Sequence, residues 1–349
     1  MYIENNLKAR CLPSVPAARE EILDVLSREI YGKLPDPVRA TAEIVSENTT
    51  AYAGKATERQ IRVVLDLANG HFVFPAVVLL PNAVEHPKLL IHLMFEQTVP
   101  NKYFPAEEVI DSGCAVAAFC YEDVTADNAD FSDGLAFYFQ RNSSDSTGKI
   151  GLWAYAAQRL ADAVLAWDSF DHHHVGVIGH SRLGKTALWC AANDTRFSLV
   201  VSNDAGSSGD ALARGKQGER VDAITRVFPF WFCQNYARYA NAEETMPFDQ
   251  HWLLAAIAPR LIFVNTAEQD AWADPESEFL SCAAASEAYT RMGLPGFIAP
   301  NRKPCPGDFD GDGSIGFAMR AGFHFLSRSD WQAALRFWQK KATGSLAEA

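Results

Sequence analysis

The residues best suited to chemistry lie in one heptapeptide, Gly179-His180-Ser181-Arg182-Leu183-Gly184-Lys185. It joins an apolar, β-branched run at 174–179 to a run of helix-forming residues at 185–192. A serine on such a strand-to-helix turn holds its hydroxyl clear of the backbone, beside N–H groups that can stabilise an oxyanion. The motif differs from G-x-S-x-G, because Leu183 occupies the position of the second glycine. The pattern predicts a nucleophile at Ser181, against the alternative of an ordinary tight connection.

A serine nucleophile needs a histidine base and an acid that orients it, and here the expected chain order is serine, acid, histidine. Two histidines lie downstream of Ser181. His324 follows a glycine just before the closing helix near residue 330, whereas His251 opens an apolar helical stretch where it would cap or be buried. We therefore expect His324 to be the base.

Two carboxylates fit the acid position. Asp204 follows the apolar run 199–202, and Asp270 follows the apolar run 261–266. Each would lie at the carboxyl end of a strand, where this chain order accepts an acid. The residues alone leave both open, and both are expected at the site.

The elements around these residues alternate in a regular way. A helix is expected at 17–32, then a hairpin of two alternating segments, 59–67 and 72–80, joined through Asn69-Gly70. Apolar strands then alternate with helices, which predicts a parallel sheet covered on both faces with active-site groups at the carboxyl ends of its strands. The expected strands are 88–94, 114–121, 174–179, 199–202 and 259–266, with a long helix at 149–167. An antiparallel start followed by a parallel core indicates an α/β-hydrolase fold.

We expect a single domain over residues 1–349, with an N-terminal helical extension at about 1–50 and an active-site insertion at about 206–250. The chain of 349 residues is 48% hydrophobic and 11% aromatic, which is enough for a large core. Its net charge is −12, without a dense run of lysine or arginine, so nucleic acid is excluded as a partner. The sequence gives no signal of oligomeric state.

Location is inferred from cysteines and apolar runs. The seven cysteines are scattered, odd in number and without a C-x-x-C pair, which favours a reducing compartment. The opening residues lack a basic segment followed by an apolar one, and no stretch is apolar for long enough to span a bilayer. We expect a cytoplasmic protein that does not interact with membranes.

Three further features are weaker candidates for function. Consecutive His172, His173 and His174 point in different directions, so they are expected at the solvated start of a strand and not around a metal. The turn Asp308–Gly313 matches the first half of a calcium loop, but Met319 occupies the position of its bidentate glutamate, which favours a plain acidic turn. Glu268 is expected to be a surface carboxylate.

With these residues in place, the chain resembles the glucuronoyl esterases, carbohydrate esterase family 15 of the α/β-hydrolases. Their nucleophile motif reads Gly-Cys-Ser-Arg-x-Gly-Lys, and here His180 replaces the cysteine. The resemblance covers most of the chain. Its other segments are Arg28–Gly32, Phe228–Phe232, Pro247–His251, Ile257–Arg260, Trp272–Pro275 and Asp330–Trp331.

The resemblance implies a role for each matching position. Ser181 would be the nucleophile and His324 the base, while Asp204 and Asp270 fall where different members place their acid. Arg182 would stabilise the oxyanion. Binding of sugar hydroxyls would fall to Lys185, Glu219 and Trp272.

Two departures concern the substrate. Family members that act on plant cell walls are generally exported, whereas this chain shows no export signal. The loop Phe95–Pro100 also lacks the Gly-Asn element of well-known members, so the acyl group accepted here can differ.

The expected function is hydrolysis of a carboxylic ester on a carbohydrate, a glucuronoyl ester on an oligosaccharide or small molecule, without metal or organic cofactor. The alternatives are a sugar deacetylase of the acetyl xylan esterase kind, which uses the same residues with a smaller acyl pocket, and a non-catalytic carbohydrate-binding protein of the same fold.

Overall fold

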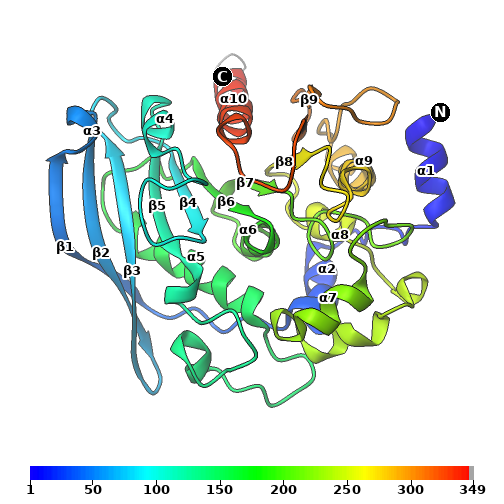
Figure 1. Ribbon diagram of the computed structural model, residues 1–349, viewed down its shortest axis with the longest axis horizontal. Helices are drawn as coiled ribbons and strands as arrows, with labels where there is room; N and C mark the ends of the chain where they lie inside the picture. Colours follow the sequence, from blue (N-terminus) through cyan, green and yellow to red (C-terminus); the bar gives the residue numbers. More distant parts are fainter. Residues whose placement is uncertain (346–349) are drawn as a thin grey trace.

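The protein, described here by a computed structural model for residues 1–345, is organised around one sheet. Within that range ten strands pair in the order β1-β2-β3-β5-β4-β6-β7-β8-β10-β9 (Figure 1). The strands are β1 (Ala40–Thr50), β2 (Ala56–Leu67), β3 (Gly70–Pro81), β4 (Leu89–Met94), β5 (Ala115–Cys120), β6 (Val175–His180), β7 (Phe197–Asn203), β8 (Leu261–Ala267), β9 (Phe309–Asp310) and β10 (Ile315–Arg320).

The sheet has an antiparallel part and a parallel part. β1, β2, β3 and β5 pair antiparallel in succession, and the run from β5 through β4, β6, β7 and β8 to β10 is parallel. The short β9 pairs antiparallel with β10 at the other edge. The predicted α/β-hydrolase arrangement, with an antiparallel start and a parallel core, is confirmed.

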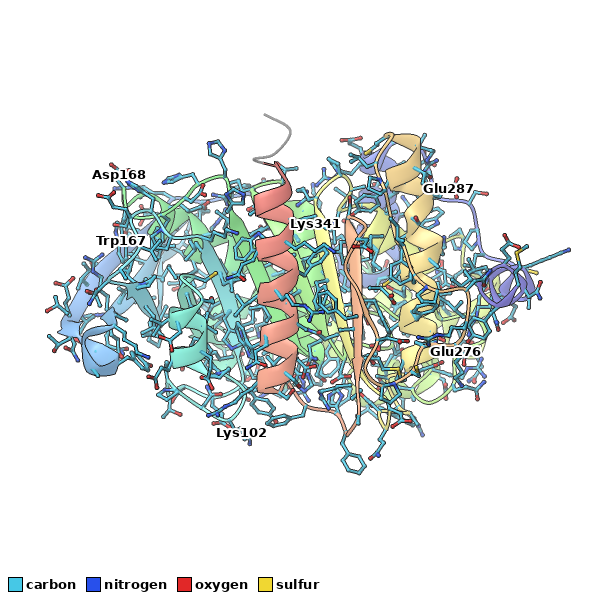
Figure 2. The ribbon with its side chains drawn as sticks, turned by 90° about the horizontal axis from the view of Figure 1, so that it is seen from above. Lys102, Trp167, Asp168, Glu276, Glu287 and Lys341 are labelled. Atoms are coloured by element: carbon cyan, nitrogen blue, oxygen red, sulfur yellow. The ribbon has the colours of Figure 1, made fainter. Side chains whose placement is uncertain are left out.

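Helices cover both faces of the sheet. The helices are α1 (Tyr2–Arg10), α2 (Arg19–Leu26), the short α3 (Ala51–Gly54), α4 (Ala106–Asp111), α5 (Lys149–Leu165), α6 (Arg182–Asn193), α7 (Val221–Val227), α8 (His251–Ala255), α9 (Pro275–Arg291) and α10 (Arg328–Ser345). One apolar core joins the sheet to α2, α5, α6, α8 and α9. A second core joins the opposite face to α4 and α10, and α10, marked by Lys341, lies over the middle of the sheet in Figure 2.

Several expected elements are confirmed. The hairpin joins Leu67 to Gly70, and the long helix expected at 149–167 is α5. The helix expected at 17–32 is α2 followed by one π-helical turn, η1 (Ser27–Tyr31), and it ends at Gly32, whose φ is +84°. A positive φ suits glycine because it has no Cβ.

The expected helical extension at about 1–50 is wrong in its last part. Residues 40–50 form β1, an edge strand whose side chains are mostly exposed. With no buried position, this segment lacks the regular apolar alternation by which strands are recognised. In the described part of the chain, no helix combines the length and the apolar character that crossing a membrane requires.

Candidate active site

Ser181 occupies a tight turn between β6 and α6. Its φ of 58° and ψ of −124° lie outside the regions that a serine normally adopts, and strain of this kind is concentrated at functional sites. The Ser181 N–H donates to the carbonyl of Asn203 on the neighbouring strand, at 2.8 Å. The turn is therefore fixed by β7, and the first N–H groups of α6 point toward the space beside the serine.

Close packing explains the glycine at position 179. A Cβ there would lie 2.0 Å from the carbonyl oxygen of Leu183, far inside contact distance. The Leu183 side chain is itself fully buried in the core. The turn therefore needs its glycine before the serine, and leucine at the second glycine position of the motif is compatible with it.

His324 and Asp270 are brought together by two loops. His324 follows β10 and Asp270 follows β8, and Nδ1 of the imidazole lies 2.5 Å from Oδ2 of the carboxylate. Burial raises the pKa of Asp270, but the hydrogen bond and charge of His324 outweigh burial and hold the pKa below its usual value. Asp270 is thus an ionised acceptor that orients the imidazole.

Ser181 and His324 line the same cavity, although no hydrogen bond joins them in the described chain. Such bonds often tighten only when substrate is bound.

Asp204 is also beside His324 but has other partners. Its Oδ1 accepts from the Ala267 N–H at 2.8 Å and its Oδ2 from the Phe325 N–H at 3.4 Å, while Arg320 lies 3.6 Å from Oδ2. Burial, followed by the nearby charge of Asp270, raises the pKa of Asp204 well above its usual value. Asp204 therefore ties the end of β8 to the histidine loop, and Asp270 is the direct partner of the imidazole.

One group could in principle hold a cation. Ligand atoms of Asp204, Asp270 and His324 lie within 4.8 Å of one another. An ion shared by all three would have to separate the close contact between Nδ1 and Oδ2. The donor set therefore fits a hydrogen-bonded pair better than a metal centre.

The guanidinium of Arg182 is held beside Ser181 from two sides. It forms an ion pair with Asp127, and it lies 4.8 Å from the ring centre of Trp231. Asp127 also accepts a hydrogen bond from Trp231 Nε1 at 2.6 Å. A fixed positive charge thus stands at the mouth of the serine turn.

The other predicted residues complete a cavity of about 340 Å³. Lys185 is buried and donates from Nζ to the carbonyl of Ala205 at 2.5 Å, and burial lowers its pKa. The Glu219 N–H donates to the carbonyl of Trp272 at 3.0 Å, and the Trp272 side chain is 58% exposed at the rim. The predicted residues around this cavity are Ser181, Arg182, Lys185, Asp204, Glu219, Asp270, Trp272 and His324.

Three site residues were not assigned from the sequence. Phe228 and Trp231, from the insertion expected at 206–250, form an aromatic wall of the cavity, with ring centres 3.8 Å apart and parallel planes. The aromatic run 228–232 was a signal for this wall. The sequence around Asp127 has no motif that indicates a site residue, because only tertiary contacts bring its loop to Arg182.

Residues given non-catalytic interpretations lie elsewhere. His251 is buried, with Nε2 3.0 Å from the carbonyl of Pro13, and Glu268 is exposed outside the cavity. In the acidic turn, Asp308 is paired with Arg302 and Asp312 with Lys340. His174 lies 2.6 Å from Asp171 at the start of β6. These contacts agree with capping, surface and turn roles.

His180, which stands where the resemblance expects cysteine, packs against the imidazole of His324 with the two ring planes tilted by 41°. The two ring centres are 4.4 Å apart, and His180 is buried. Burial, followed by the charge of His324, lowers the pKa of His180 to about 3. The ring is therefore a neutral packing support for His324.

Comparison with known proteins places the chain among carbohydrate esterases. A sequence family described as "Glucuronyl esterase, fungi" matches residues 68–293. The carbohydrate esterase MZ0003 of an unknown prokaryotic organism is 30% identical, with 93% of this chain and 84% of that protein covered. The 4-O-methyl-glucuronoyl methylesterase of Hypocrea jecorina is 31% identical over 52% of this chain and 42% of its own length. The solved glucuronoyl esterase of Solibacter usitatus superposes with a TM-score of 0.84 at 31% identity, covering 92% of this chain and 91% of the other.

Proposed function

Because the chain belongs to the glucuronoyl esterase family, a family of carboxylic ester hydrolases, we propose that it hydrolyses glucuronoyl esters on carbohydrates with Ser181 as nucleophile. The observation that carries the proposal is the arrangement around one cavity of a strained serine, a histidine bonded to a buried aspartate, and a fixed arginine.

The reaction proceeds in two steps. His324 accepts the hydroxyl proton of Ser181 while the serine oxygen bonds to the ester carbon, and collapse of the tetrahedral intermediate breaks the bond to the alcohol. The imidazolium gives its proton to the departing alcohol. Water then attacks the acyl-enzyme with His324 again as base, and the free uronic acid leaves with Ser181 restored.

Negative charge on the carbonyl oxygen develops next to Arg182. Its guanidinium and the first free N–H groups of α6 stabilise this negative charge, and both are in place before the reaction. Asp270 keeps the imidazole oriented and stabilises its charged form. No step requires a metal or an organic cofactor.

The sugar would lie against the polar groups of the cavity. Lys185 and Glu219 offer a donor and an acceptor to its hydroxyl groups, and Trp272 offers an exposed ring at the rim. The aromatic wall of Phe228 and Trp231 adjoins these polar groups, with Lys185 Nζ 5.9 Å from the ring centre of Trp231.

Purified protein should be assayed on benzyl glucuronate and on an acetylated xylo-oligosaccharide, with Ser181→Ala as the matched variant. We expect turnover of the glucuronate ester and its loss in a variant whose circular dichroism is unchanged. Preference for the acetylated sugar would show a deacetylase instead. No turnover of either ester, together with retained sugar binding, would show a non-catalytic module.

A further inference from the structure

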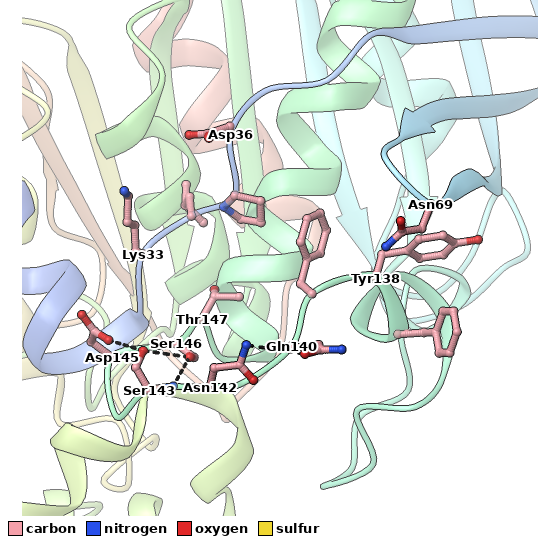
Figure 3. A pocket seen from close by; sticks show the side chains of 14 residues that line it. Lys33, Asp36, Asn69, Tyr138, Gln140, Asn142, Ser143, Asp145, Ser146 and Thr147 are labelled. Carbon is pink, nitrogen blue, oxygen red and sulfur yellow. Dashed lines mark hydrogen bonds between the residues drawn. The ribbon is translucent and has the colours of Figure 1, made fainter.

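A second hollow, the side groove, shares no lining residue with the cavity beside Ser181. Its volume is about 910 Å³, within the range of about 300–1,000 Å³ found for ligand sites. Figure 3 shows that its walls come from three distant parts of the chain: residues 33–36 after η1, Asn69 at the hairpin turn, and residues 137–147 between β5 and α5.

An aromatic strip, Phe137, Tyr138 and Phe139, forms part of the wall. The Tyr138 hydroxyl donates to the carbonyl of His71 at 2.9 Å, and the ring of Phe139 packs edge-on against Tyr155 of α5 at 5.7 Å. Two of the three rings, those of Tyr138 and Phe139, are thus fixed. The Phe137 side chain is nevertheless 64% exposed. Together with the half-buried rings of Tyr138 and Phe139 it forms a contiguous aromatic surface facing the groove, and contiguous apolar surface of this kind is found at interaction sites.

Polar side chains with unused hydrogen-bonding capacity line the same groove. Within residues 1–345, the side chains of Lys33, Asp36 and Asn69 make no hydrogen bond or ion pair, and Gln140 only accepts one weak bond from Asn142 at 3.5 Å. They supply amide, ammonium and carboxylate groups, so the groove offers both hydrogen-bond donors and acceptors, and Asn69 lies beside Tyr138 (Figure 3).

The charges and rings that line the groove indicate which class of ligand it can bind. The lining charges are one lysine and two aspartates, Asp36 and Asp145, so a polyanion would be repelled by the carboxylates. A purely apolar ligand would remove water from groups that it could not bond. A pyranose chain matches both features, because its C–H faces pack on aromatic rings and its hydroxyl groups bond to amides and charged groups.

One loop lines the side groove and also contacts residues of the cavity beside Ser181. The loop between β5 and α5 carries Asp127, which holds Arg182 and Trp231, and further along it builds the groove. At the end of that loop Gly148 packs on the main chain of Trp231, where a Cβ would lie 2.2 Å from the carbonyl oxygen. One wall of the ester cavity is therefore backed by the loop that forms the groove.

We propose that the side groove binds a neutral stretch of the polysaccharide backbone that carries the ester. This rests on the proposed function for the identity of the polymer, and the groove itself has no role in the bond-breaking steps. It makes the enzyme favour an ester attached to a long glycan over the same ester on a small alcohol.

Binding is tested with unesterified sugars, so the result does not depend on esterase activity. Xylohexaose, cellohexaose and mannohexaose are titrated calorimetrically into the full chain, into Phe137→Ala and into the double variant Asn69→Ala/Gln140→Ala. We expect at least one hexaose to bind, and its Kd to rise at least fivefold in both variants. Ile44→Ala, which removes a 50% exposed side chain from β1, serves as the control and should leave Kd unchanged.

Kinetics supply a second readout. The ratio of kcat/KM on a polymeric glucuronoxylan ester to kcat/KM on benzyl glucuronate should fall at least fivefold in Phe137→Ala, through KM, and stay constant in Ile44→Ala. The proposal is overturned if no hexaose binds at millimolar concentration, or if binding survives Phe137→Ala and is lost in Lys185→Ala. Failure of all ester turnover would refute the proposed function instead, and the titrations would still decide the groove.

Discussion

At the scale of single residues, the two aspartates beside His324 lie in different environments. Asp270 is ionised because it faces His324 at 2.5 Å, whereas Asp204 is buried among backbone N–H groups and its pKa is raised by burial. Two carboxylates in one site can therefore divide the work, one orienting the base and the other fixing its loop.

Matched substitutions separate these roles. Asp270→Asn should lower kcat by about 10²–10⁴-fold, because an amide in place of the carboxylate favours the wrong imidazole tautomer. Asp204→Asn keeps an oxygen for the Ala267 N–H and should lower kcat less than about tenfold. Steady-state kinetics on benzyl glucuronate measures both, and the reverse order of effects would make Asp204 the catalytic acid.

The lowered pKa of Asp270 also makes the stability of the folded protein depend on pH. A carboxyl group whose pKa is depressed by folding stabilises the protein above its unfolded pKa, and that contribution is lost as the pH falls through the folded pKa. Chemical unfolding below about pH 4 should therefore show a smaller loss of stability in Asp270→Asn than in the native chain. Equal losses in the two proteins would contradict this linkage.

Most of the site residues could be predicted from sequence, and the structure gathers them around one cavity. The serine turn has local signals, and chain order limits the base to two histidines. The choice between the two aspartates could not be made, because both follow apolar strands and only the positions of the loops differ. Asp127 lies in a long loop whose path depends on tertiary contacts.

At the scale of elements, one loop connects the site to the helical layer. Lys149, at the start of α5, is fully buried and donates from Nζ to Thr125 Oγ1 and to the carbonyl of Asp130, both at 2.6 Å. It also pairs with Asp133 at 3.1 Å. These bonds fix the segment that carries Asp127, and hence the guanidinium of Arg182.

Replacing this anchor should affect stability and catalysis together. Lys149→Met removes the donor to Thr125 Oγ1, to the carbonyl of Asp130 and to Asp133, and should cost about 2 kcal/mol of unfolding free energy, with at least a tenfold loss of kcat/KM. Lys55→Met removes a surface lysine paired with Glu107 and Asp111 and should cost less than about 1 kcal/mol. Urea unfolding compares the two, and similar costs would contradict the anchoring role.

Elements with a clear apolar period were predicted, and weakly patterned ones were not. The hairpin, α5 and the central strands follow from local sequence. β1 is mostly exposed, and β10 follows a segment rich in proline, glycine and aspartate, so neither shows its pattern clearly. Since β10 carries His324 to the site, the position of that histidine depended on an element that the sequence did not reveal.

At the scale of the whole molecule, all seven cysteines are unpaired. Five are buried and two, Cys11 and Cys305, are exposed. Burial raises the pKa of Cys120 and Cys233 to about 11, so these thiols are protonated and unreactive in the folded chain. The buried cysteines therefore act as small apolar side chains of the core.

Thiol counting tests that picture. Ellman's reagent should titrate two thiols rapidly in the folded protein and seven in guanidinium chloride without reductant. The melting temperature should be unchanged by dithiothreitol. Fewer than seven thiols after unfolding would show a disulfide and would contradict the free cysteines of the structure.

The most direct measurement concerns the identity of the nucleophile. The full chain is treated with a fluorophosphonate, and peptide mass spectrometry locates the adduct in the native protein, in Ser181→Ala and in His324→Ala. We predict a single adduct on Ser181, absent in Ser181→Ala and formed at least a hundredfold more slowly in His324→Ala. Glucuronate ester turnover that persists in Ser181→Ala, or an adduct on another residue, would contradict a serine esterase built on Ser181.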